Sequence, residues 1–288
     1  MQSGDSWTRS AALVAAFVAL AAGMAAQGPG DLELMLTHVG DRVEQYYRRA
    51  QSLVCHETVT LVHLSANFSP EEFARVLEYE LRVAWEADAD GGEPQEATVT
   101  RQLLKINGRK PKPDTEPGCT DPRSIAPDPL NFLLPHNRAQ YIFGWSRARG
   151  GDRGTVMVDY RSRETGTPEV SWRGDCVSFD LPGRTKGRIW IDSGTHDVMR
   201  MDEQLIGQFN YRLPREKVRF GDDWWVIERA DTSVRYRAVA FHEPEETLVL
   251  PATIESFQVN RGAGIPRLRT TQRFSDYKRF LTGARIVK

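Results

Sequence analysis

The fold prediction starts from residues 187–202, which read GRIWIDSGTHDVMRMD. Before the turn, apolar Ile189 and Ile191 alternate with polar neighbours, and after it Met199 and Met201 do the same, as in strands that bury one face. The residues between the two runs, DSGT, are turn formers. The pattern therefore predicts an antiparallel hairpin whose apolar side chains share one face.

Similar runs, rich in β-branched and aromatic residues, surround this hairpin and are separated by Gly, Pro, Asn and Asp. They cover residues 58–62, 80–87, 99–106, 155–161, 169–181, 187–192, 198–205, 224–241, 247–259 and 267–274. From residue 155 onward no helical pattern separates these runs. Strands that are joined by short turns pair antiparallel, so we expect one antiparallel sheet.

One amphipathic helix is expected before the strands. Its apolar residues recur at spacings of four and three, namely Leu32, Leu36, Val39, Val43, Tyr46, Ala50 and Leu53. Gly40 interrupts this pattern at a cost of about 1 kcal/mol relative to alanine. The predicted fold class is α+β and mainly β: a strongly twisted antiparallel sheet forms an incomplete β-barrel, and the N-terminal helix packs on its concave face.

Irregular and short helical segments are also expected. Five prolines fall within residues 110–128, so this stretch is predicted as a long surface loop of a single β-rich domain, residues 27–288. The order Ser69, Pro70, Glu72 matches a capping box and predicts a short helix there. A second short helix is expected from residue 128, with Pro135 ending or kinking it.

The first residues are typical of a secretory signal. Arg9 precedes an apolar run over residues 11–20, and small residues continue to Ala26. We therefore expect residues 1–26 to be a signal peptide and the protein to be periplasmic or secreted. The alternative is a membrane anchor, but residues 11–26 are shorter than the roughly 20 that a span requires. No other long apolar run follows, so no membrane span is expected after cleavage.

The net charge and the cysteines indicate which partners and which covalent links to expect. The net charge of −1 argues against a general nucleic-acid binder. An exported chain with Cys55, Cys119 and Cys176 meets an oxidising compartment, where one disulfide is plausible. We predict that Cys119 pairs with Cys176, because Cys55 follows the apolar helix face and should be buried. The alternative is three small buried thiols.

No motif for catalysis, metal binding or cofactor binding is complete in the sequence. His56 and Glu57 begin an HExxH pattern, but Thr60 stands where the second histidine belongs. The cluster from His242 to Glu246 contains Pro244 and is typical of a solvated turn between strands. GxSxG, GxGxxG and phosphate-loop patterns are absent. We therefore expect no cofactor and no metal, and a binding protein in preference to an enzyme.

The hairpin at residues 187–202 resembles that of the periplasmic lipoprotein-carrier (LolA/LolB-like) superfamily: a strand, an aspartate, a small turn, and a return strand that ends in an acidic residue. Residues 43–47 (VEQYY), Glu57 and residues 274–280 (FSDYKRF) resemble a group of uncharacterised exported bacterial proteins. The carrier resemblance implies an incomplete β-barrel closed by helices, with an apolar cavity for acyl chains.

The leading functional hypothesis is a non-catalytic envelope protein that binds a lipophilic or amphipathic ligand, such as a lipid or acyl chain, in a half-barrel cavity. The residues expected to line that cavity are Leu36, Val43, Tyr46, Trp190 and Trp225. Trp224 and Trp225 are adjacent, so their strand presents one indole on each face. The alternative is a structural or protein-interaction module with an envelope protein partner, and a third possibility is a hydrolase of unrecognised type.

Overall fold

The computed structural model describes residues 29–50, 52–85, 97–112, 129–146, 154–173, 176–181, 183–218, 223–242, 245–262 and 267–279. The predicted signal peptide, most of the proline-rich loop and Cys119 lie outside these residues. The predicted disulfide therefore stays a prediction.

The described elements follow the order expected from the sequence, with a helix first and strands after it. The helical elements are α1 (Pro29–Arg49), η1 (Asn131–Leu133), α2 (Pro135–Arg138) and η2 (Arg215–Lys217). The strands are β1 (Ser52–His63), β2 (Arg75–Trp85), β3 (Ala97–Ile106), β4 (Tyr141–Trp145), β5 (Thr155–Ser162), β6 (Glu169–Arg173), β7 (Cys176–Asp180), β8 (Thr185–Asp192), β9 (Val198–Leu205), β10 (Phe209–Arg212), β11 (Trp224–His242), β12 (Glu245–Arg261) and β13 (Arg267–Arg279).

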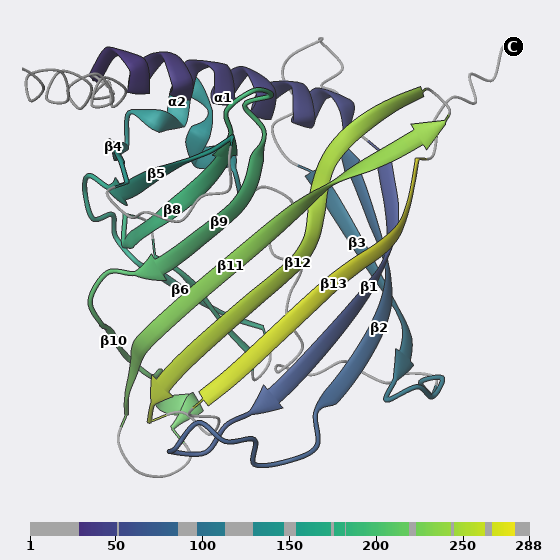
Figure 1. Cartoon of the computed structure of the whole chain (residues 1–288). Coiled ribbons are helices and arrows are strands. Elements are labelled where there is room, and N and C mark those ends of the chain that lie inside the picture. Colours follow the sequence, from purple (N-terminus) through teal and green to yellow (C-terminus); the bar gives the residue numbers. More distant parts are fainter. Residues whose placement is uncertain are drawn as a thin grey trace, which may run out of the picture.

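Eleven strands of the described chain form one antiparallel sheet (Figure 1). Its order is β3-β2-β1-β13-β12-β11-β9-β8-β5-β4, with β10 added beside β11. β6 and β7 pair as a separate two-stranded ribbon. Among the described residues the edge strands β3 and β4 do not pair with each other, so the sheet is not closed. The predicted fold class, an incomplete barrel of antiparallel strands with an N-terminal helix, is confirmed.

One transverse row of side chains defines the inner face of the sheet. Directly paired residues carry the row from β5 to β2: Val158, Ile189, Met201, Val234, Ile254, Gln272, Val59 and Leu77. Paired residues in a sheet point to the same face, and every member of this row is buried. Apart from Gln272 the row is apolar, so it provides the hydrophobic surface onto which other elements pack.

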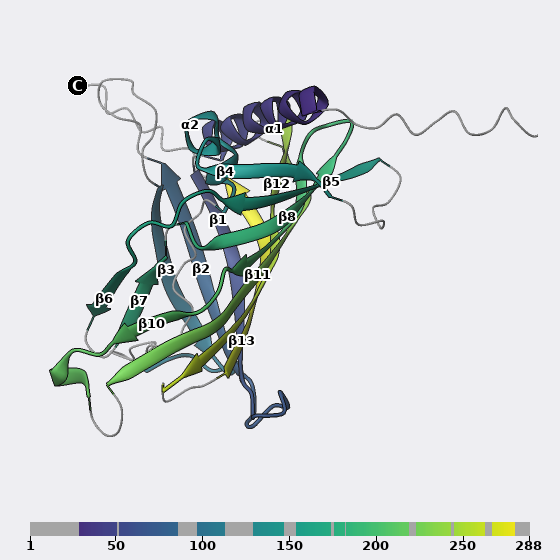
Figure 2. The same cartoon turned by 90° about the vertical axis from the view of Figure 1, so that its left-hand side faces the viewer.

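The α1 helix lies across one end of this sheet (Figures 1 and 2). Its buried residues Leu36, Val39, Val43 and Tyr47 join the same core cluster as the inner residues of β5, β8, β9, β11 and β12. Burial of each such aliphatic side chain contributes about 1.5–3 kcal/mol. Gly40 has a packing role that the sequence did not reveal, because a Cβ there would lie 3.2 Å from the Leu133 carbonyl oxygen of η1.

A second inner row explains why glycine occupies position 187. Gly187 pairs with Tyr160 on one side and Glu203 on the other. A Cβ at Gly187 would lie 2.1 Å from the Asp202 carbonyl oxygen and 2.7 Å from the Tyr160 ring. The absence of a side chain therefore lets the Tyr160 ring cross β8 and reach Glu203.

We expect Gly187→Ala to destabilise the protein by about 1–3 kcal/mol, the usual cost of overpacking a core. Gly144→Ala is the matched control, because Gly144 also lies in a strand and a Cβ added there would meet nothing within 4 Å. Urea unfolding of both variants measures the difference. Equal midpoints for the two variants would contradict this account.

The register of the 187–202 hairpin differs from the prediction at one residue. The pairing shifts between Trp190 and Ile191, so that Ile191 faces Val198 and Met199 is the extra residue. Val198 is buried and Met199 is exposed. The prediction that Met199 shares the apolar face is therefore wrong, because a β-bulge changes which residues of a strand face the core.

Other local predictions also need correction. Residues 69–72 form no helix; Pro70 bridges to Leu64 within the turn between β1 and β2. The short helix expected before Pro135 is present as η1, which ends at Leu133; Pro135 also begins α2, as suits a residue whose missing N–H is not needed in the first turn. The predicted strand over residues 169–181 is two strands, β6 and β7.

Candidate functional site

A pocket lies between α1 and the inner face of the sheet. Its walls come from α1, the β8–β9 turn, the β11–β12 hairpin and the segment before η1. Apolar lining residues are Val43, Tyr46, Leu130, Val198, Tyr236, Leu248 and Val249, and polar ones are Arg42, Gln45, Arg49, His196, Asp197 and Thr247. The lining is thus divided almost evenly between apolar and polar residues, so the pocket could contact both parts of an amphipathic ligand.

The pocket is small. Its cavity volume is about 40 Å³, which has room for only a few water molecules, since each needs roughly 10–15 Å³. Ligand pockets in proteins occupy roughly 300–1,000 Å³. A lipid chain therefore fits only if α1 or side chains move.

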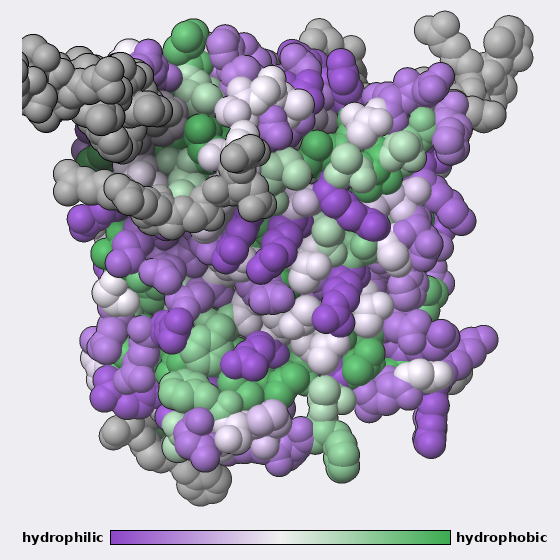
Figure 3. Space-filling view, in the orientation of Figure 1, coloured by the Kyte–Doolittle hydropathy of each residue, from purple (hydrophilic) through white to green (hydrophobic). Residues whose placement is uncertain are grey.

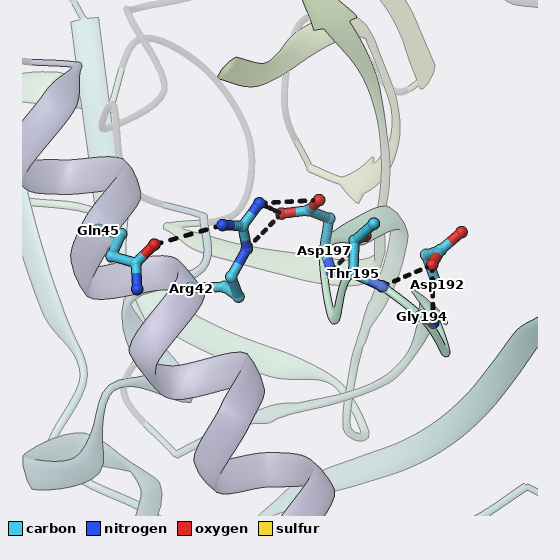
Figure 4. A network of polar contacts seen from close by, with 6 residues as sticks. All are labelled: Arg42, Gln45, Asp192, Gly194, Thr195 and Asp197. Atoms are coloured by element: carbon cyan, nitrogen blue, oxygen red, sulfur yellow. Dashed lines mark hydrogen bonds and ion pairs between the residues drawn. The ribbon is translucent and has the colours of Figure 1, made fainter. Parts of the chain in front are cut away.

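An ion pair joins α1 to the β8–β9 turn at the rim of this pocket (Figure 4). The Arg42 Nε donates to Asp197 Oδ1 at 3.0 Å, and Nη2 donates to Oδ2 at 3.1 Å. The Asp197 side chain is mostly buried and that of Arg42 is about one-third exposed. The rings of His38 and His196 lie 4.6 Å apart beside this pair. Together these contacts hold α1 against the hairpin.

The sequence of the β8–β9 turn explains how Asp197 is positioned. Asp192 Oδ1 accepts hydrogen bonds from the backbone N–H groups of Gly194 at 2.9 Å and Thr195 at 2.8 Å. These bonds lower the pKa of the Asp192 carboxyl below its usual value. His196 adopts a φ of +62°, which turns the chain back toward α1. The DSGT turn formers therefore determine where the Asp197 carboxylate lies.

The structure places the five predicted cavity residues in different surroundings. Val43 and Tyr46 line the pocket, whereas Leu36 lies in the packed core beneath α1. Trp190 is on the outer face, with the Arg200 guanidinium 4.5 Å from its ring centroid. Trp225 packs in a separate cluster, its ring 5.7 Å from that of Tyr211. A single cavity lined by all five residues stays a prediction.

Two polar clusters on the inner face were not predicted. In the first, Tyr160 Oη donates to Glu203 Oε2 at 3.0 Å. Burial raises the pKa of the Glu203 carboxyl, and burial together with the Glu203 charge raises the pKa of Tyr160. The Tyr160 ring also packs with those of Phe132, Tyr141 and Phe143.

The second cluster is a buried ion pair between β1 and β3. Arg101 donates to both carboxylate oxygens of Glu57, at 2.7 Å from Nε and 2.6 Å from Nη2. Gln272 Nε2 on β13 donates to the same carboxylate at 3.0 Å. The guanidinium of Arg101 also lies 4.1 Å from the centroid of the Tyr79 ring. The contacts join four strands, β1, β2, β3 and β13, which gives the cluster a structural role.

Cys55 lies beside this ion pair and is a buried free thiol, as its sequence position predicted. Burial and the Glu57 charge raise its pKa to about 12. The reactive thiolate is therefore scarce at neutral pH. We expect iodoacetamide at pH 8 to leave Cys55 unmodified in the folded protein and to label it in 6 M guanidinium chloride, as peptide mass spectrometry would measure. Rapid labelling of the folded protein would contradict the assigned burial.

The described residues contain no group of three or more His, Cys, Asp or Glu side chains that could hold a metal ion. His242 ends β11 and Glu245 begins β12, while residues 243 and 244 lie outside the described part. No helix among the described residues is both long and apolar enough to cross a bilayer.

No protein-family model matches the sequence, and no significant match to a curated protein was found. The fold is similar to a solved structure of a LolA superfamily protein from Nitrosomonas europaea, with 9% sequence identity and a TM-score of 0.36. That alignment covers 87% of this chain and 96% of the other.

Proposed function

We propose that this chain is an exported, lipoprotein-carrier-like envelope protein that binds a lipophilic or amphipathic ligand between α1 and the inner face of its half-barrel. The observation that supports this proposal best is the pocket beneath α1, which has an apolar wall and a charged rim. An apolar chain would contact Val43, Val198 and Val249. A polar head group would remain near Arg49 and Thr247.

The small volume of the pocket implies that α1 moves when the ligand enters. The helix ends at Arg49 and β1 begins at Ser52, so its C-terminal end is tethered to the sheet. Further along the helix, the Arg42–Asp197 pair connects it to the β8–β9 turn. In this proposal the ion pair holds α1 closed, and its rupture lets α1 swing away from Val198 and Val249.

Two measurements test the proposal. Native mass spectrometry of the full chain purified from its own host should reveal a retained lipid. The delipidated protein should then bind a long-chain fatty acid that carries an environment-sensitive fluorophore. Absence of both signals would overturn the proposal.

A bulky substitution locates the ligand. Val249→Trp should fill the pocket and weaken probe binding by about tenfold or more, because the volume available to the chain is lost. Trp190→Phe is the matched control, since Trp190 lies on the outer face. Equal affinity of both variants would exclude this pocket as the binding site.

The second candidate is a structural or protein-interaction module. The cavity volume of only about 40 Å³ favours it, because a packed interior does not need a ligand. Under this function Val249→Trp would lower the thermal midpoint, and no lipid would be retained by the wild-type protein.

A further inference from the structure

A mixed apolar and basic patch lies on the outer face of the sheet, at the end opposite α1. We call it the rim patch; its members are Phe68, Arg229, Phe257, Val259, Arg267 and Arg269. Arg229 pairs with Val259, which pairs with Arg267, and Phe257 pairs with Arg269, so the strand residues share one face. Figure 3 shows apolar residues gathered toward this end of the outer face, with hydrophilic residues beside them.

Aromatic and basic side chains of the rim patch lie close to one another, with two of the guanidinium groups near an aromatic ring. The Arg229 guanidinium lies 5.0 Å from the centroid of the Phe257 ring. The Phe68 ring meets Phe257 edge-on at 5.8 Å, and the Arg267 guanidinium lies 5.6 Å from Phe68. Phe68 has a φ of +64° and stays about half exposed. A bulky residue rarely adopts this backbone conformation, and here it directs the ring onto the outer face.

More apolar side chains are exposed at the same end of the molecule. Phe73, in the turn between β1 and β2, is fully exposed. Trp224 begins β11 and is about half exposed. Exposed apolar residues that form a contiguous patch usually mark a site of interaction with a protein or a membrane.

Of the three arginines in the rim patch, one is paired with an acidic residue, and within the described residues the other two are not. Arg229 is paired with Asp231. By contrast, Arg269 is exposed and no acidic partner contacts it among the described residues, while the buried Nε of Arg267 has no hydrogen-bond partner there. Glu71 and Glu72 precede Phe73 and are the opposing charges in the turn.

We propose that the rim patch docks onto an anionic phospholipid surface. Aromatic side chains favour the interface between head groups and hydrocarbon, and arginine can contact phosphates while its stem stays in apolar surroundings. Each basic residue near an anionic leaflet strengthens binding. A second copy of the chain is the poorer occupant, because it would bring two sets of unpaired arginines together. The α1 helix lies at the other end of the sheet (Figure 1), so docking would leave the pocket that α1 helps to line exposed to solvent.

Vesicle flotation of the full chain tests this proposal. The wild-type protein should float with vesicles of phosphatidylcholine and phosphatidylglycerol at a ratio of 7:3, and should not float with phosphatidylcholine alone. Raising the salt concentration to 1 M should reduce binding, since exposed charges are then screened. Equal flotation with both vesicle types, or none with either, would overturn the proposal.

Two double variants test whether vesicle binding depends on the rim patch in particular or on any exposed arginine. Arg267→Gln/Arg269→Gln should weaken binding to anionic vesicles about tenfold or more. The matched control is Arg235→Gln/Arg273→Gln, because both arginines are exposed on the outer face nearer α1, where each flanks Thr253. An equal loss in the two double variants would show that the patch is not the docking surface.

The aromatic contribution is tested by Phe73→Ser, which removes a fully exposed ring and should leave the fold intact. Binding to anionic vesicles should fall severalfold, whereas Glu71→Gln/Glu72→Gln should increase it. Unchanged binding in both would overturn docking by this end of the molecule. All these variants should still bind the fluorescent fatty acid in solution, so failure of docking is distinct from failure of the proposed ligand site.

Discussion

Arg101→Leu is expected to lower the free energy of unfolding by about 3–5 kcal/mol, the typical cost of breaking a buried ion pair from one side. Glu57 is 1% exposed and receives two hydrogen bonds from Arg101. When the guanidinium is removed, the Gln272 amide remains as a side-chain donor to the carboxylate. One neutral amide donor does not compensate a buried charge. Urea unfolding followed by fluorescence measures the loss.

A second substitution distinguishes charge from packing in this cluster. In Arg101→Leu/Glu57→Gln the buried charge is absent, while the new amide oxygen can still accept the hydrogen bond from Gln272. We therefore expect the double variant to recover about 2 kcal/mol relative to Arg101→Leu, a coupling within the usual range for contacting residues. A double variant no more stable than Arg101→Leu would show that the loss comes from packing against Tyr79.

The sequence predicted the features that depend on local periodicity. The alternation in residues 187–192 and 198–205 gave strands β8 and β9 close to their observed bounds. The helical spacing of Leu36, Val39 and Val43 identified the face of α1 that is buried. Both patterns survive in the fold because the residues that carry them face one continuous core.

Contacts between residues that lie far apart in the sequence were not predicted. Arg101 and Glu57 are 44 residues apart, and Arg42 and Asp197 are 155 apart. No sequence spacing reports such contacts, because the register of β1, β2 and β3 determines the first and the packing of α1 on the β8–β9 turn determines the second. The bulge that exposes Met199 is missed for a related reason: the partner strand decides which residue is extra. Short β4 and β10 give too few residues for their alternation to be recognised.

Val43→Asp is expected to have the largest effect, because it places an unpaired carboxylate in the core that joins α1 to the sheet. Val43 is 3% exposed, and its cluster includes Val39, Val234 and Ile254. Losses above about 4 kcal/mol are exceptional for single substitutions and arise from changes of this kind. Since whole proteins are stable by roughly 5–15 kcal/mol, the variant should be largely unfolded or lack a docked α1.

Two observations separate these outcomes. Circular dichroism reports whether the sheet persists, and hydrogen exchange of residues 29–49 reports whether α1 has detached. Val43→Ala is the control, because it removes packing without adding charge and should cost about 1–3 kcal/mol, as smaller core truncations do. If α1 detaches while the strands stay protected, α1 is a separable cover of the half-barrel, as the proposed movement requires. If Val43→Asp melts like the wild type, Val43 faces solvent and the assigned packing of α1 is wrong.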